Sequence, residues 1–263
     1  MKRFFFFGFI LFDFLTVQSQ DSTYMRRSSE ESLKQLPVLW QQTAAEYRAL
    51  CYQAFNIAEI RISALKKRRH EKRAIITDLD ETILDNSYSE ANLIKDGKEY
   101  SSAEWKRWVN QSAATEVPGA AAFLQWAHTK GLTIFYISNR DTSQVMATLQ
   151  NLKKLQLPNA DTAHMMFSSN TSSKETRRQR VMGKYKVVML LGDNLNDFTQ
   201  FFETKNIADR KTEVDKVRKD WGDKFIVLPN STYGEWENAL YDYERKLTPQ
   251  QKEEKRENKL IGY

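Results

Sequence analysis

The fold is decided by residues 74–82, which read AIITDLDET. Apolar and β-branched residues come first, a run that is typical of a strand buried on both faces. Asp78 and Asp80 follow this run directly. If the extended conformation continues through Asp78, both side chains point the same way, and a turn just beyond brings both carboxylates to one pocket. We therefore expect a strand at 74–77 that leads into a pair of acidic groups.

Further runs of the same kind lie at 133–137, 187–191 and 225–228. Stretches with helical patterning, at 120–129 and 142–155, fit between them. Apolar strands that alternate with helices predict a parallel sheet with helices on both faces. The predicted fold class is therefore α/β, with a doubly wound parallel sheet and a smaller helical cap domain. In such sheets ligands bind at the carboxyl ends of the strands.

Polar side chains follow two more of these strands, in addition to the first aspartate pair. Ser138 and Asn139 come after the second strand, Asp193 and Asp197 come after the third, and Lys174 lies between these two sites. The carboxyl ends of parallel strands share one edge of a sheet, so we expect these groups to meet there. A polar turn that merely caps a helix is the ordinary explanation of an aspartate pair, but it does not account for this agreement.

An acidic cluster at this edge would repel a phosphate unless a cation lies among the carboxylates. Carboxylate oxygens, a backbone carbonyl and waters suit an octahedral Mg²⁺ ion. Histidine and cysteine are missing from the motifs, which disfavours zinc. The sequence therefore predicts a magnesium site.

The rest of the chain divides around this core. Residues 37–73 are predicted to form an N-terminal helix, with apolar residues at helical spacing from 37 to 65, and a charged linker. The catalytic core is expected at 74–247, with a helical cap insertion at about 88–116, where the sequence has no strand pattern. Residues 248–263 are a charged tail, either a solvated helix or a disordered end.

The N-terminus has the pattern of a secretory signal peptide at 1–19, followed by a flexible segment at 20–36. Lys2 and Arg3 precede an apolar stretch at 4–15 that is too short to cross a bilayer. No cysteine follows this stretch, so we expect no lipid anchor there. The predicted location is the periplasm or the medium, as a protein without a stable membrane attachment.

Composition limits the kinds of partner. The chain has 263 residues, 41% of them hydrophobic and 28% charged, as in an ordinary globular protein. Its formal net charge of +6 is a mild excess that favours small anions over a nucleic acid polymer. Cys51 is the single cysteine, which excludes an internal disulfide.

Two longer motifs carry a resemblance to a known family. Residues 76–86, ITDLDETILDN, and 191–198, LGDNLNDF, resemble the bipartite signature of the class C acid phosphatases of the haloacid dehalogenase superfamily. The resemblance extends from about Trp40 to about Leu247. It implies a Mg²⁺-dependent phosphomonoesterase with an acidic to neutral pH optimum.

The resemblance also implies roles for the acidic residues, in agreement with their chemistry. Asp78 would be the nucleophile that forms an aspartyl-phosphate, and Asp80 would be the general acid and then the general base. The metal ligands would be the Asp78 carboxylate, the Asp80 backbone carbonyl and Asp193. Asp197 would order the waters of the metal.

The remaining candidate residues would contact the substrate. Ser138, Asn139 and Lys174 would bind the phosphoryl oxygens. Tyr100, in the cap, and Tyr233, after the last strand, align with aromatic positions that stack on a nucleobase or a pyridine ring in this family. An equally good interpretation of these tyrosines is packing between cap and core.

The substrates expected are small phosphomonoesters, such as 5′-nucleotides or nicotinamide mononucleotide, and the family suggests a homodimer. Two alternatives stay open at this point. One is a catalytically silent surface protein of the same fold that binds a ligand such as haem. The other is a phosphotransferase that passes the phosphoryl group to an alcohol.

Overall fold

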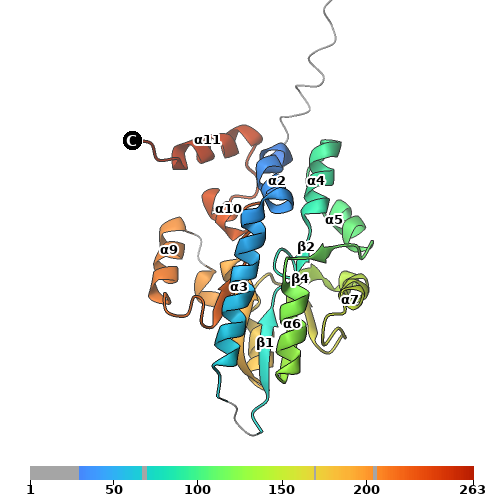
Figure 1. The fold of residues 1–263 in the computed structure, drawn as a ribbon. Coiled ribbons are helices and arrows are strands. Elements are labelled where there is room, and N and C mark those ends of the chain that lie inside the picture. The colour runs from blue at the N-terminus through green and yellow to red at the C-terminus, as the bar shows by residue number, and fades with distance from the viewer. Residues whose placement is uncertain (1–29, 67–69, 169, 204–205) are drawn as a thin grey trace, which may run out of the picture.

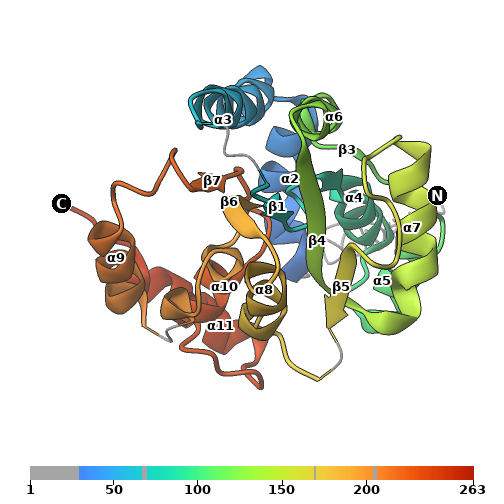
Figure 2. The ribbon, with the colours of Figure 1, turned by 90° about the horizontal axis from the view of Figure 1, so that it is seen from below.

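The computed structural model describes residues 30–66, 70–168, 170–203 and 206–263. The predicted signal peptide lies outside the described residues. The centre of the molecule (Figure 1) is a parallel sheet in the order β5-β4-β1-β6-β7, which Figure 2 shows with all five strands labelled. Its strands are β1 (Arg73–Thr77), β4 (Leu132–Asp141), β5 (Met165–Ser168), β6 (Lys186–Gly192) and β7 (Phe225–Val227). The predicted parallel α/β sheet is confirmed.

Apolar residues cover both faces of the central strand, which explains why residues 74–76 of β1 are an unbroken apolar run. Ile75 packs into a core cluster with Phe55 of α3 (Ala45–Ser63) and Phe123 of α6 (Ala120–Thr129). Its neighbour Ile76 points to the other face and packs near Val181 of α8 (Glu175–Met182). The alternation follows from the two-residue period of a strand. Figure 2 shows α3 and α6 on one side of the sheet and α8 on the other.

The order of the strands determines where a ligand can bind. From β1 the chain moves outward through β4 to β5, then returns to the other side of β1 with β6 and continues outward to β7. The direction of winding therefore reverses between β1 and β6. A crevice opens at the carboxyl ends of the strands at such a reversal, which is the position of the motifs at 78–82 and 192–197.

The predicted helical insertion consists of α4 (Ser87–Asp96) and α5 (Ser102–Val109). A short antiparallel pair, β2 (Leu84–Asp85) with β3 (Thr115–Glu116), joins the two ends of the insertion. On the N-terminal side, η1 (Glu30–Lys34) and α2 (Gln35–Thr43) pack against α4. The cap is thus made of the insertion and of the first helices of the described chain.

Several details differ from the expectations. The single helix expected at 37–65 is two helices, α2 and α3, because Ala44 between them has an extended backbone with ψ of 126°. Residues 30–36, expected to be flexible, form η1 and the start of α2. The helix expected at 142–155 begins as η2 (Thr142–Gln144) and continues as α7 (Val145–Lys154). Strand β5 was not expected, since its sequence, MMFS, is short and lacks β-branched residues.

The last part of the chain is helical. The remaining elements are η3 (Leu195–Asp197), η4 (Gln200–Phe202), α9 (Ile207–Lys216), α10 (Glu235–Leu240) and α11 (Pro249–Lys259). Of the two states considered for the charged tail, the helix is correct: Thr248 caps α11, and Arg256 pairs with Glu30 at 2.9 Å. Among the described helices, none combines the length and the apolar character that a bilayer span requires.

Candidate active site

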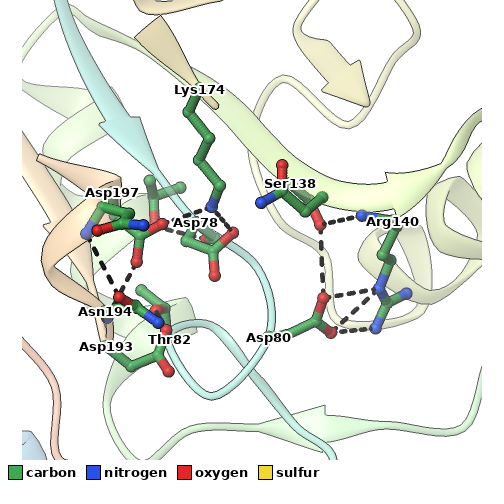
Figure 3. Close-up of polar contacts among 12 residues, drawn as sticks. Asp78, Asp80, Thr82, Ser138, Arg140, Lys174, Asp193, Asn194 and Asp197 are labelled. Carbon is green, nitrogen blue, oxygen red and sulfur yellow. Dashed lines mark hydrogen bonds and ion pairs between the residues drawn. The ribbon is translucent and has the colours of Figure 1, made fainter. Parts of the chain in front are cut away.

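Three aspartates meet at the carboxyl ends of β1 and β6. Asp78 follows β1, whereas Asp193 and Asp197 lie just beyond β6, and one carboxylate oxygen from each lies within 4.8 Å of the other two. Figure 3 shows these side chains converging from the two strands. The sequence prediction that these aspartates share one edge of the sheet is confirmed by their geometry.

The turn after β6 holds Asp197 in place. The backbone N–H of Asn194 donates to Asp197 Oδ2 at 3.0 Å, and the Asn194 side chain accepts from the backbone of the short helix η3. Gly192 makes this packing possible, because a Cβ atom at that position would lie 2.4 Å from the Cβ of Asp197. Any larger residue at 192 would therefore displace the Asp197 carboxylate.

Lys174, the residue before α8, lies between two of the aspartates. Its ammonium group donates to Asp197 Oδ1 at 2.6 Å and also to Asp78 Oδ1. Lys174 is buried. Burial alone would lower the pKa of Lys174, but the carboxylates of Asp197 and Asp78 outweigh it and raise the pKa above its ordinary value. Lys174 is therefore a fixed cation at the site.

The three carboxylates carry more negative charge than one ammonium group can balance. Burial, with the charges of Asp197 and Asp80, raises the pKa of Asp78 to about 7 even though Lys174 opposes this shift. Burial, with the charges of Asp197 and Asp78, raises the pKa of Asp193 well above its ordinary value. A second cation would relieve this excess, and a set of aspartate oxygens is the donor chemistry of a hard divalent ion. The residues present thus fit a metal.

The raised pKa of Asp78 predicts how stability depends on pH when metal is removed. The folded protein holds this proton more tightly than the unfolded chain does, so the contribution of Asp78 to stability is present at low pH and is lost between about pH 4 and about pH 7. We expect Asp78→Asn to become increasingly more stable than the parent across this window, because the amide carries no charge. Urea unfolding of both proteins in a chelator measures the difference.

The comparison with Asp78→Asn cancels the titration of groups that do not interact with Asp78. A difference in unfolding free energy that stays constant from pH 4 to pH 8 would contradict the prediction. Excess divalent metal should reduce or reverse the advantage of the variant, since the metal stabilises the charged carboxylate.

Asp193 is held by two neutral donors on the side away from Lys174. Thr82 Oγ1 donates to Asp193 Oδ1 at 3.2 Å, and Asn230 Nδ2 donates to Asp193 Oδ2 at 2.7 Å. Thr82 belongs to the first motif, and Asn230 lies in the loop after β7. These contacts fix the direction of the carboxylate, as outer partners of metal ligands commonly do.

The Asp80 carboxylate lines the same cavity as Asp78 but does not join the three-aspartate group. It is turned toward Arg140, whose Nη2 lies 2.7 Å from Asp80 Oδ1, and Asn86 Nδ2 donates to the same oxygen at 2.8 Å. Figure 3 shows Asp80 and Arg140 on one side of Ser138 and the Lys174 group on the other. The two aspartates of the first motif thus have different surroundings, as different chemical roles would require.

The structure places the other predicted phosphate contacts around this site. Ser138 is fully buried between Asp80 and the backbone of Arg140, with its hydroxyl 3.4 Å from Asp80 Oδ2. Asn139 points to the other side of the strand, where it donates to Ser172 O at 2.9 Å and accepts from Arg177 Nη2 at 2.6 Å. Asn139 therefore holds the loop that carries Lys174, in addition to lining the cavity.

Sequence reasoning did not assign roles to Arg140 and Asn86. The signal for Arg140 was available, since it follows Ser138 by two positions in one strand and so lies on the same face. Asn86 gave no such signal, because its contact with Asp80 depends on the turn between β1 and β2.

A cavity of about 1010 Å³ opens above the aspartates, between core and cap. Tyr100 and Tyr233 both line it. The Tyr233 hydroxyl donates to Glu81, and the Lys34 ammonium lies 6.0 Å from the centre of the Tyr233 ring. Burial first, and then the charge of Asp80, raise the pKa of Glu81 to about 8. Tyr100 is 54% exposed, so its ring remains accessible from the cavity.

Comparison with known proteins places this geometry in context. The model of the HAD superfamily, subfamily IIIB (acid phosphatase), matches residues 15–236. The class C acid phosphatase from Bacillus anthracis is 39% identical, with a TM-score of 0.84 over 89% of this chain and 98% of that one. The same Bacillus anthracis enzyme with tungstate bound gives a TM-score of 0.85 at 39% identity, over 89% of this chain and 99% of that one.

Proposed function

Because the chain belongs to the acid phosphatases of HAD subfamily IIIB and is a phosphomonoesterase of the class C type, we propose that it hydrolyses small phosphomonoesters through an aspartyl-phosphate on Asp78, with Mg²⁺ as cofactor. The observation that carries this proposal is the group of Asp78, Asp193 and Asp197 around Lys174. It combines a nucleophile, oxygen ligands for a cation and a fixed positive charge for the phosphoryl group.

The proposed reaction has two displacements at phosphorus. In the first, a carboxylate oxygen of Asp78 attacks phosphorus, the ester bond breaks, and Asp80 gives a proton to the leaving oxygen. In the second, Asp80 takes a proton from a water molecule that attacks the phosphoenzyme and releases phosphate. Lys174 and the Ser138 hydroxyl bind the phosphoryl oxygens, which gain charge during both displacements.

The metal would be held by the carboxylates of Asp78 and Asp193 and by the backbone carbonyl of Asp80, with Asp197 ordering its waters. Its chemistry is the neutralisation of negative charge between the nucleophile and the phosphoryl oxygens. Asp197 already accepts a hydrogen bond from Lys174, so it also keeps the ammonium group beside the nucleophile.

The dimensions of the cavity and its two tyrosines support an alkyl phosphate whose leaving group carries an aromatic ring, such as a nucleobase. A volume of about 1010 Å³ exceeds what a phosphate needs and accommodates a nucleoside. The rings of Tyr233 and Tyr100 offer flat faces on which a nucleobase or a pyridine ring stacks irrespective of its identity. The proposed substrates are therefore 5′-nucleotides and nicotinamide mononucleotide.

A panel of substrates tests this assignment on Tyr233. We expect Tyr233→Ala to lower kcat/KM for 5′-nucleotides about 10- to 100-fold, since the loss of one stacked ring costs roughly 1–3 kcal/mol. Hydrolysis of glycerol phosphate should change much less. Tyr233→Phe separates the ring from the hydroxyl, because it keeps the stacking face and loses only the hydrogen bond to Glu81.

Tyr52 provides the matched control, since it is an exposed tyrosine of α3 away from the cavity-lining residues. Tyr52→Ala should leave kcat/KM unchanged for both 5′-nucleotides and glycerol phosphate. Equal losses for nucleotides and glycerol phosphate in Tyr233→Ala would remove the stacking role while leaving the phosphatase chemistry intact.

Export through the N-terminal segment is part of this proposal, supported by the charged and apolar pattern of 1–19. An enzyme of this kind outside the cytoplasm would release phosphate and dephosphorylated products for uptake. The homodimer remains a prediction from the family resemblance.

A further inference from the structure

The two oxygens of the Asp80 carboxylate have very different surroundings. Oδ1 accepts from Arg140 Nη2 at 2.7 Å, from Arg140 Nε at 3.1 Å and from Asn86 Nδ2 at 2.8 Å. Oδ2 has only longer contacts, with Arg140 Nε at 3.2 Å and Ser138 Oγ at 3.4 Å. Oδ1 is thus surrounded by N–H donors, and Oδ2 has fewer and longer contacts.

The Arg140 guanidinium is itself held firmly, so the direction of its donors is fixed. It is buried, and its Nη1 donates to Thr148 Oγ1 at 2.9 Å. The Trp105 ring lies against it, with 5.4 Å from the guanidinium carbon to the ring centre. A planar guanidinium that is held on both sides keeps its N–H donors in a fixed direction, and these donors then set the orientation of the carboxylate.

Asn86 is held from the cap in a similar way. It is completely buried, and its side-chain oxygen accepts from Trp108 Nε1 at 2.8 Å. Trp105 and Trp108 both belong to α5. One cap helix therefore contacts both of the side chains that donate to Asp80 Oδ1.

We propose that Arg140 and Asn86 are positioning residues that keep Asp80 Oδ1 as a hydrogen-bond acceptor and leave Oδ2 to carry the transferred proton. This inference rests on the proposed role of Asp80 as the general acid. An O–H group at Oδ1 would face N–H donors and would have to displace one of them, whereas Oδ2 can carry a proton without losing a close partner. Helix α5 sets the orientation through Trp105 and Trp108.

The transfer balances in atoms and charge. As the bond from phosphorus to the ester oxygen breaks, its electron pair stays on that oxygen, which takes the proton from Oδ2. The new bond forms between phosphorus and Asp78, and Asp80 becomes a carboxylate whose charge faces Arg140. The alcohol leaves without a charge.

The test uses leaving groups that differ in their need for a proton. A 4-nitrophenolate leaves without protonation, whereas an alkoxide requires it, so only alkyl esters depend strongly on Asp80. We expect Arg140→Gln to lower kcat/KM for an alkyl phosphate about 100-fold, in the range of general acid catalysis, and that for 4-nitrophenyl phosphate less than about 5-fold. kcat/KM is the relevant constant because it reports the first displacement.

Arg107→Gln is the matched control. Arg107 lies on α5 beside Trp108, but its side chain is 60% exposed and pairs with Glu104. The same loss of charge at position 107 should leave kcat/KM unchanged for both substrates. Arg140→Lys keeps the charge without the planar fork and should recover only part of the alkyl activity.

Trp108→Phe tests the link to the cap and does not depend on whether the Arg140 variants fold. It removes one donor to Asn86 and keeps an aromatic ring, so we expect the same selective loss on alkyl esters, of about 2- to 10-fold. Equal decreases of kcat/KM for both esters in the folded variants, or no decrease for either ester, would overturn the inference.

Asp80→Asn, measured in parallel, separates this inference from the function on which it depends. If kcat/KM for alkyl phosphates falls selectively in Asp80→Asn but not in the Arg140 and Trp108 variants, the positioning role is wrong and the proposed function stands. If Asp80→Asn shows no selectivity either, the role of Asp80 as general acid is wrong, and the positioning role fails with it.

Discussion

Asp78→Asn is expected to lower kcat for every phosphomonoester by about 10⁴-fold or more, as the loss of a covalent nucleophile does in other hydrolases. The amide has nearly the same shape as the carboxylate but does not attack phosphorus. The fold should remain intact, because the replaced carboxylate is buried and its pKa is already raised to about 7. The measurement is the initial rate of phosphate release with 4-nitrophenyl phosphate and with a 5′-nucleotide.

Acid quenching gives a second readout of the same variant. With substrate labelled in the phosphoryl group, the parent enzyme should retain label on the protein, and Asp78→Asn should retain none. Asp96→Asn is the control, since Asp96 is an exposed residue at the end of α4 and pairs only with Lys98 in the described contacts. Activity of Asp78→Asn within tenfold of the parent would disprove the nucleophile assignment.

Removal of divalent metal is expected to abolish turnover, and addition of Mg²⁺ should restore it. Without the cation, the buried carboxylates of Asp78, Asp193 and Asp197 face the incoming phosphate, and among the described residues Lys174 is the one cation that forms ion pairs with this group. Repulsion would then disfavour both binding and attack. Dialysis against a chelator, followed by titration with Mg²⁺ while phosphate release is measured, tests the expectation.

Asp193→Asn tests whether the Mg²⁺ requirement depends on the Asp193 carboxylate as a metal ligand. We expect the Mg²⁺ concentration for half-maximal activity to rise at least about 100-fold, since the variant loses a charged ligand and not merely an outer partner. Asn230→Ala removes one donor to Asp193 and should cause a smaller shift in the same direction. Full activity in the chelator, or an unchanged Mg²⁺ requirement in Asp193→Asn, would contradict the metal site.

Much of the architecture could be predicted because the strands of a parallel sheet are marked by local composition. Residues 74–77 are apolar or β-branched and are buried on both faces, and the structure confirms them as the central strand. The break at Ala44 could not be predicted, since an alanine in a continuous helical pattern favours a helix. Packing of α2 against α4 and of α3 against α6 requires a change of direction there.

The candidate site was predictable to the same extent. Asp78, Asp193 and Asp197 follow strand ends, and strand ends of a parallel sheet share an edge, so their convergence needed no knowledge of side-chain contacts. Lys174 was selected by its motif, and the structure places it between Asp78 and Asp197. Asn139 shows the limit of this reasoning, because its contacts with Ser172 and Arg177 depend on how α8 and the loop before it pack against β4.

The sequence alone determined four of the five strands of the sheet and the acidic groups at the strand ends, because both follow from local patterns and from the direction of a parallel sheet. Only the tertiary structure decided which partners those groups have. Asp80 meets an arginine 60 positions away, and Tyr233 donates to a glutamate 152 positions away. Such contacts depend on how loops close and how the cap packs on the sheet, and local sequence patterns do not encode these distances.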